Sequence, residues 1–206
     1  MENISEELQE VVKFHGHLCP GVVLGYRVAK LARNELGLKR SPDEELVAIV
    51  ENDTCAVDAI QFINGATFGK GNLIFKDHGL HAYTFIKRNS GKKIRIELKS
   101  DVFKDASDKR HEIMKKINDK VPLSEEENAF LKDSRSEKIN QILTKPDQEL
   151  FDIKEVDIEI PEKARIFNSV KCSKCGLSVM ETRARLLNDR TYCIPCWEEE
   201  LDKNKN

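Results

Sequence analysis

The chain has 206 residues, with 34 lysines and arginines against 36 acidic residues and a net charge of −2. This length suits one medium-sized domain plus a small module, and the near-neutral balance excludes a globally basic surface for nucleic acid or anionic membranes. The chain lacks the run of about 18 apolar residues that a membrane span needs, and its acidic start, Met1 to Glu7, is unlike a signal peptide, so we expect a cytoplasmic protein.

The first forty or so positions predict two helices. Ser5 can cap the first helix, whose apolar residues recur at helical spacing until Gly16 interrupts them. Pro20 suits the first turn of the second helix, and Gly37 is placed to end it. The segment between the two helices is short and contains histidine and cysteine.

The next stretch predicts a sheet interrupted by a third helix. Asp53 or Thr54 can cap this helix, and Gly65 ends it. The triplet Asn89-Ser90-Gly91 separates two alternating runs and is typical of a hairpin. The strands that we expect are residues 46–50, 72–76, 82–88 and 93–98.

From Ser107 the pattern becomes helical and strongly polar. Pro122 breaks it, the residues 124–127 form a capping box that restarts it, and Pro146 stops it. Apolar positions over 151–160 then predict one more strand.

Two domains follow from this order of elements. Residues 1–165 predict an α+β core in which an antiparallel sheet packs against helices. Residues 161–167 read as a linker, and residues 166–206 predict a small zinc-finger domain. A module of this size with few large apolar side chains needs its metal to fold.

Four cysteines mark the small module. Cys172 and Cys175 are separated by two residues, as are Cys193 and Cys196, and seventeen residues lie between the pairs. Two residues between cysteines allow a tight turn to aim both sulfurs at one ion, so two such pairs predict a structural zinc site with four thiolate ligands. The alternatives are two disulfides or two redox-active pairs, for which the matching two-residue spacing of both pairs would be a coincidence.

A second cluster lies between the first two helices. His15, His17 and Cys19 alternate, so in an extended segment they face the same side. Pro20 keeps Cys19 extended and places it at a helix N-terminus, where the thiolate is favoured. Cys55, at the start of the third helix, offers the same chemistry, and the four side chains could hold zinc or another transition metal.

Other ionisable residues are weaker candidates. Asp53 could act as an acid or base beside Cys55, with Cys19 and Cys55 as candidate catalytic thiolates. His78 and His81 straddle a glycine with no cysteine nearby, so we expect plain hydrogen-bonding roles for them. His111 lies in a lysine-rich helical stretch and should be on the surface.

Three motifs, residues 14–21, 52–59 and 69–73, closely resemble the FmdE family, which takes its name from a component of formylmethanofuran dehydrogenase. The resemblance covers essentially the whole chain, and its metal motif falls on His15, His17, Cys19 and Cys55.

The resemblance implies an α+β core, a treble-clef or ribbon-like zinc module and an intertwined homodimer. One departure is Gly79-Leu80-His81, where many members have a Gly-Lys pair. In the enzyme that gives the family its name, the molybdenum or tungsten chemistry belongs to other components.

Three functions compete. We favour a metal-binding accessory, metal-sensing or regulatory protein that docks a protein partner through its finger and binds a metal or small ligand in the core. The second is a metal- or thiol-dependent enzyme linked to C1 metabolism on methanofuran. The third is a nucleic-acid-binding transcriptional regulator using Arg183, Arg185 and Arg190. From Arg165 onward, however, eight basic and six acidic residues, together with zinc and its four thiolates, leave the module near neutral, so its attraction to phosphates is weak.

Overall fold

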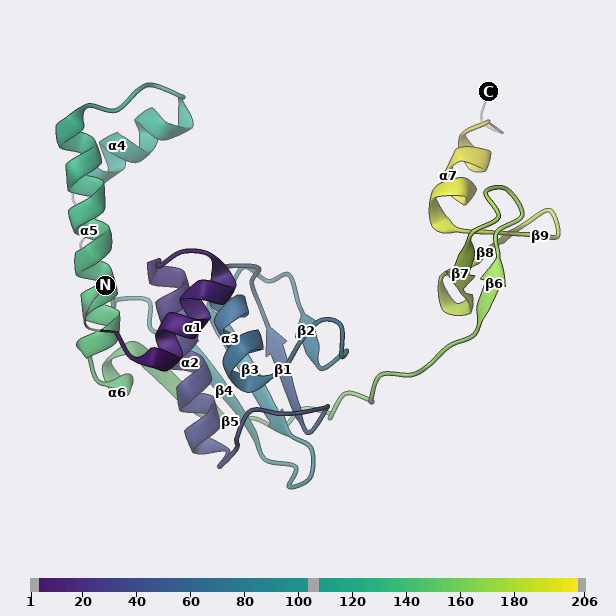
Figure 1. Cartoon of the computed structure of the whole chain (residues 1–206), viewed down its shortest axis with the longest axis horizontal. Helices are drawn as coiled ribbons and strands as arrows, with labels where there is room; N and C mark the ends of the chain where they lie inside the picture. The colour runs from purple at the N-terminus through teal and green to yellow at the C-terminus, as the bar shows by residue number, and fades with distance from the viewer. Residues whose placement is uncertain (1–3, 104–107, 204–206) are drawn as a thin grey trace. The chain divides into compact units, whose positions relative to one another are not determined.

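The computed structural model describes residues 4–103 and 108–203. The chain forms two compact units, residues 1–163 and 164–206, which are described separately (Figure 1). The boundary between them lies two residues before the one expected from the sequence.

Three helices and their caps open the first unit: α1 (Glu6–His15), α2 (Pro20–Glu35) and α3 (Ala56–Asn64). The Ser5 hydroxyl caps α1 as expected, accepting a hydrogen bond from the Leu8 N–H at 3.3 Å. For α3 the prediction was wrong by one or two residues, because Cys55 and not Asp53 or Thr54 occupies the N-cap position. Both α2 and α3 therefore begin directly after a cysteine.

A five-stranded sheet forms the centre of the unit, in the order β2-β1-β3-β4-β5. Its strands are β1 (Leu46–Val50), β2 (Leu73–Phe75), β3 (Ala82–Lys87), β4 (Lys93–Leu98) and β5 (Phe151–Glu155). The expected hairpin of β3 and β4 is present, and β4 continues antiparallel to β5. One pair departs from the antiparallel expectation: β1 and β2 run parallel, because α3 lies between them in the chain and returns it to the same end.

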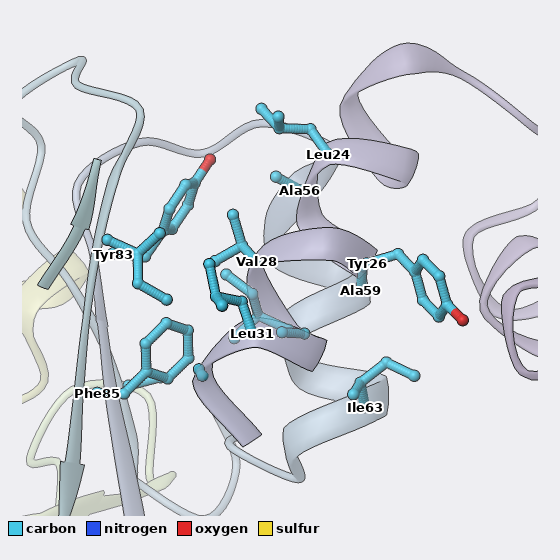
Figure 2. Packing of buried hydrophobic residues seen from close by; sticks show 14 of the residues in the cluster. Leu24, Tyr26, Val28, Leu31, Ala56, Ala59, Ile63, Tyr83 and Phe85 are labelled. Atoms are coloured by element: carbon cyan, nitrogen blue, oxygen red, sulfur yellow. The ribbon is translucent and has the colours of Figure 1, made fainter. Parts of the chain in front are cut away.

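The main hydrophobic core lies where α2 and α3 pack on one face of the sheet (Figure 2). Tyr83 and Phe85 point from β3 into this layer, opposite Val28 of α2 and Ala59 of α3. All four are fully buried. Burial of each large side chain contributes about 1.5–3 kcal/mol, so this layer fixes how the two helices lie on the sheet.

The other face of the sheet is covered by the chain's own connecting segment. Val47, Ile49 and Ile86 form a smaller buried cluster, against which Ile158 and Ile160 pack. The strand expected over 151–160 ends at Glu155. The apolar residues beyond it instead cover this second face, since alternation alone does not distinguish a strand from a covering segment.

An ion-pair network lies on the same side of the sheet. Glu51 is 5% exposed and receives hydrogen bonds from the Arg95 guanidinium, while His78 lies 3.0 Å from it. Arg95 also donates to Glu97 at 2.7 Å. The Arg95 guanidinium first, and His78 after it, lower the pKa of Glu51 from 4.5, against the opposing effect of burial.

Replacing Arg95 by methionine is expected to cost about 2 kcal/mol at neutral pH, because the buried Glu51 carboxylate loses its guanidinium partner and keeps only the hydrogen bond with the His78 ring. In the wild type the folded-state pKa of Glu51 lies below its unfolded value. The ion pair therefore stabilises fully above pH 4.5 and its contribution is lost as the pH falls through the folded-state pKa. Urea unfolding at neutral and acidic pH should show the penalty of the variant shrinking in acid.

The matched control is Lys93→Met on the same strand. The partner of Lys93, Asp157, is fully exposed, so this change should cost less than about 0.5 kcal/mol at any pH. Equal penalties for the two variants would contradict the assignment to the buried carboxylate.

Three helices follow β4: α4 (Asp108–Asn118), α5 (Glu125–Thr144) and α6 (Asp147–Leu150). Ser124 and Glu127 form the expected capping box of α5. Ser107, the expected start of the polar helix, lies outside the described residues. Arg27 of α2 fixes the end of α5 by donating to the carbonyls of Ile142, Leu143 and Lys145 and to Asp147.

The second unit consists of two hairpins and a helix. Its elements are β6 (Ser169–Lys171), β7 (Ser178–Met180), a 3-10 turn (Glu181–Arg183), β8 (Arg185–Leu187), β9 (Arg190–Tyr192) and α7 (Ile194–Lys203). Cys172 follows β6, and Cys196 lies in the first turn of α7. A hairpin knuckle followed by a second hairpin and a helix is a treble-clef arrangement.

None of the helices within residues 4–103 and 108–203 combines the length and the apolar composition that crossing a membrane requires.

Candidate metal centres

The finger brings its four cysteine sulfurs together. The sulfurs of Cys172, Cys175, Cys193 and Cys196 all lie within 4.8 Å of one another, and those of Cys175 and Cys193 are 3.8 Å apart. A tetrahedron with zinc–sulfur bonds of about 2.3 Å also separates its sulfurs by about 3.8 Å. The four side chains are therefore suited to hold a zinc ion.

The proton affinities of these thiols differ widely. The backbone N–H groups of Cys175 and Cys193 point at the sulfur of Cys172 and lower its pKa to about 6. The Cys193 thiol, and then burial, raise the pKa of Cys196 to about 12. Thiolates this close repel one another, so binding of a divalent cation is what allows all four to lose their protons.

A small buried cluster surrounds this centre. Cys172, Cys196 and Tyr192 are its buried residues, with Leu187 and Trp197 packed beside them. Thus much of the buried cluster consists of ligand side chains. That the unit needs its metal to fold stays a prediction from the sequence.

The core unit brings together the second predicted group. One ligand atom from each of His15, His17, Cys19 and Cys55 lies within 4.8 Å of the others. The Nε2 atom of His15 is 3.8 Å from the sulfur of Cys19, close to the separation of about 3.5 Å expected for two ligands of a tetrahedral zinc. These residues also fit a transition metal with two nitrogen and two sulfur ligands.

The side chains converge for a different reason from the one that the sequence suggests. His15 is not extended; it is the last residue of α1, and Gly16 turns the chain with a φ of 97°. Cys19 is extended, and its sulfur accepts a hydrogen bond from the Val22 N–H at 3.3 Å as the N-cap of α2. A helix end and a helix start thus meet at the site, joined by His17.

Asp58 contacts one of the candidate ligands. Its carboxylate lies 2.7 Å from Nδ1 of His15, which leaves Nε2 facing the Cys19 thiol. A carboxylate in this position fixes the tautomer and the ring orientation of a ligating histidine. We did not predict this role from the sequence, although Asp58 lies three residues after Cys55 and so on the same face of α3.

The two thiols lie close because α2 and α3 begin side by side. A Cβ atom placed on Gly21, in the first turn of α2, would lie 3.1 Å from the Cβ of Cys55. Burial, and then the neighbouring Cys19 thiol, raise the pKa of Cys55. The expectation of an activated thiolate at Cys55 was therefore wrong for the metal-free protein, because burial outweighs the helix N-terminus.

The remaining candidates lie outside this group. Asp53 is exposed in the turn before α3 and contributes no ligand atom to the cluster. His78 hydrogen-bonds Glu51, and His81 approaches the Tyr83 hydroxyl at 3.4 Å. His111 is exposed on α4, as expected.

Sequence models of two known families match the two units of the chain. The sequence model of the FmdE family, described as "FmdE, Molybdenum formylmethanofuran dehydrogenase operon", matches residues 14–152. The chain belongs to the FmdE family. In this FmdE protein, residues 165–200 also match the prokaryotic dksA/traR C4-type zinc finger, so its second unit is a C4-type zinc finger.

Two known proteins are similar to this FmdE protein. A probable S-adenosyl-L-methionine-binding protein of Archaeoglobus fulgidus is 34% identical over 178 residues, which are 84% of this chain and 48% of that protein. The chain thus spans about half the length of this curated relative. The crystal structure of a tungsten formylmethanofuran dehydrogenase FmdE-like protein from Syntrophus aciditrophicus matches 94% of this chain and 91% of its own, with a TM-score of 0.61 and 23% identity. That likeness shows the shared fold.

Proposed function

We propose that this FmdE protein holds a second transition metal through His15, His17, Cys19 and Cys55. We further propose that it acts as an accessory or regulatory protein whose finger docks a protein partner. The observation that carries the proposal is the convergence of these four side chains together with the carboxylate that orients His15. Packing alone gives no reason for two histidines and two cysteines to converge in this way, whereas a metal site requires it.

The number of protein ligands supports a binding role over catalysis. Four protein ligands complete the tetrahedral shell of zinc, and a catalytic zinc keeps one position for water or substrate. Both groups in this chain supply four. The core group differs from the finger in that His17 is exposed, so the metal could enter or leave on that side. Exchange of this kind suits a sensing or storage role.

Metal analysis by atomic emission tests the core site. We expect two metal ions per wild-type chain and one per chain in His17→Ala and Cys19→Ala, with the finger zinc retained. A single zinc per chain that survives both substitutions would show that the core group binds no metal. Circular dichroism of each variant checks that the fold is kept.

Replacing Asp58 by asparagine is expected to weaken metal binding at the core by about 10–100-fold, because His15 loses the carboxylate that orients its ring. Competition with a chromogenic chelator measures this affinity. Asp53→Asn is the matched control, since it removes an exposed carboxylate near Cys55 that contacts none of the four ligands. Equal affinities for the Asp58 and Asp53 variants would contradict the orienting role.

An enzyme that acts on C1 units is the main alternative. The exposure of His17 favours it, because loss of this one ligand would leave three protein ligands and an open position. A metal bound there would supply Lewis acidity, while Cys19 and Cys55 would hold it in place. Turnover of a formyl compound by the metal-loaded protein, abolished in Cys19→Ala, would favour this alternative over the accessory role.

A second candidate ligand comes from the Archaeoglobus fulgidus relative. Its name includes binding of S-adenosyl-L-methionine, and 178 residues of this chain align with it. Calorimetric titration with S-adenosyl-L-methionine tests whether this chain, which aligns with about half of that relative, also binds this compound.

Nucleic-acid binding through Arg183, Arg185 and Arg190 is less favoured, because the neutral finger gives little attraction to phosphates.

A further inference from the structure

The two cysteines of the core group come from two helices that begin side by side. Cys19 is the N-cap of α2, and Cys55 is the N-cap of α3. Gly25 of α2 lies directly against the backbone of Ala56, the first residue of α3. This close approach of the helices holds the two N-caps next to each other, and the two sulfurs lie within 4.8 Å of each other.

Gly21 leaves room for the two thiols to meet. It lies in the first turn of α2, and a Cβ atom placed on it would be 3.7 Å from the sulfur of Cys55 and 3.9 Å from that of Cys19. Both sulfurs therefore lie over the same bare stretch of helix backbone. A glycine at this position gives the two thiols a shared space on the first turn of α2.

The two sulfurs differ in how firmly they are held. The Cys19 side chain is 8% exposed, and its sulfur accepts a hydrogen bond from the Val22 N–H at 3.3 Å. Cys55 is more exposed, and within the described helix α3 no N–H group caps its sulfur. A disulfide needs sulfurs about 2.05 Å apart, and rotation of the Cys55 side chain can supply this approach.

We propose that Cys19 and Cys55 form a reversible disulfide when the core group is without its metal, with a low-molecular-weight disulfide as the oxidant. The reaction removes two of the four ligands, because a sulfur in a disulfide is no longer a thiolate. Metal binding and disulfide formation therefore exclude each other. This exclusion rests on the proposed core metal site, whereas formation of the disulfide itself does not.

The reaction is a thiol–disulfide exchange in two steps. The sulfur of the more exposed Cys55 loses its proton and attacks one sulfur of the small disulfide, whose S–S bond breaks and releases one small thiol. The Cys19 sulfur then loses its proton and attacks the Cys55 sulfur of this mixed disulfide, which releases the second small thiol. The two cysteines are oxidised, and the small disulfide is reduced to two thiols that take up the two protons.

Peptide mapping of the full chain tests the proposal. A chelator removes metal from the core group, atomic emission verifies that the finger keeps its zinc, and glutathione disulfide is the probe. After alkylation of the remaining thiols, we expect one linked peptide pair containing Cys19 and Cys55, reversed by a reducing agent, while the four finger cysteines are alkylated. A chain in which Cys19 and Cys55 are both alkylated, or both carry glutathione, would overturn the proposal.

Two serine variants separate the two steps. Cys19→Ser should accumulate glutathione on Cys55, because the thiol that resolves the mixed disulfide is missing. Cys55→Ser is the matched control and should carry little glutathione, because Cys19 is buried. Circular dichroism checks that both variants are folded. Equal amounts of adduct in wild type and Cys19→Ser, or in the two variants, would contradict the proposed order of attack.

Zinc tests the link between the disulfide and the metal. Zinc at a concentration about tenfold above its dissociation constant should slow disulfide formation by about tenfold, because only the metal-free fraction reacts. Disulfide formation that zinc does not slow would overturn the mutual exclusion and the core metal site together. Failure of the metal-depleted chain to form the disulfide would overturn this inference alone, so the two failures are distinguishable.

Discussion

Replacing Cys172 by serine is expected to remove zinc from the finger and unfold residues 164–203 while the core unit stays folded. Cys172 is 1% exposed and belongs to the small buried cluster of the finger, so the change removes a ligand and part of the core together. Structural zinc contributes on the order of 10 kcal/mol in modules of this kind, far more than the remaining apolar contacts. Zinc content by atomic emission and amide hydrogen exchange measure the two effects.

Ser173→Ala is the matched control for this experiment. Ser173 lies between the two ligands of the first knuckle, but its side chain is exposed and contributes no sulfur. It should keep full zinc content and full protection of the finger amides. If Cys172→Ser kept one zinc in the finger and the same protection, the four-cysteine centre would not be what holds this unit together.

The finger could be predicted from sequence because its determinants are local. Two Cys-x-x-Cys pairs specify a ligand set by spacing alone, and each turn is formed by residues adjacent in the chain. The helices of the core were predictable for the same reason: Ser5, Ser124 and Pro146 act on their immediate neighbours. The positions of these residues along the chain are therefore sufficient to predict the ligand set of the finger and the ends of these helices.

The geometry of the core site depends on contacts between distant residues. The motif from His15 to Cys19 indicates metal ligands, yet the convergence comes from a helix end at His15 and from the pairing of α2 with α3. Asp58 and His15 are 43 positions apart, and Arg135 reaches the carbonyl of Leu18 from a helix whose polar sequence resembles a solvated surface. Burial likewise decides the pKa of Cys55, and burial depends on the whole fold.

Replacing Gly25 by alanine is expected to destabilise the core unit by about 3 kcal/mol or more. A Cβ atom on Gly25 would lie 2.2 Å from the backbone oxygen of Ala56 and 2.5 Å from its Cα. Neither atom can move without moving α3, so α2 and α3 must separate, and the packing of Val28 against Ala59 is disturbed. Overpacking of this kind costs about 1–3 kcal/mol where side chains can adjust, and more where backbone is struck. Urea unfolding measures the loss.

The same substitution at Gly69 provides the control, because no atom lies within 4 Å of a Cβ placed there. Gly69→Ala should change stability by less than about 0.5 kcal/mol. Gly25 allows α2 and α3 to approach each other closely, and the N-caps of these helices are Cys19 and Cys55. Separation of the two helices should therefore also weaken metal binding at the core, while the finger keeps its zinc. Loss of stability with unchanged core affinity would mean that the thiols are held by the segment around His17 and not by the helix contact.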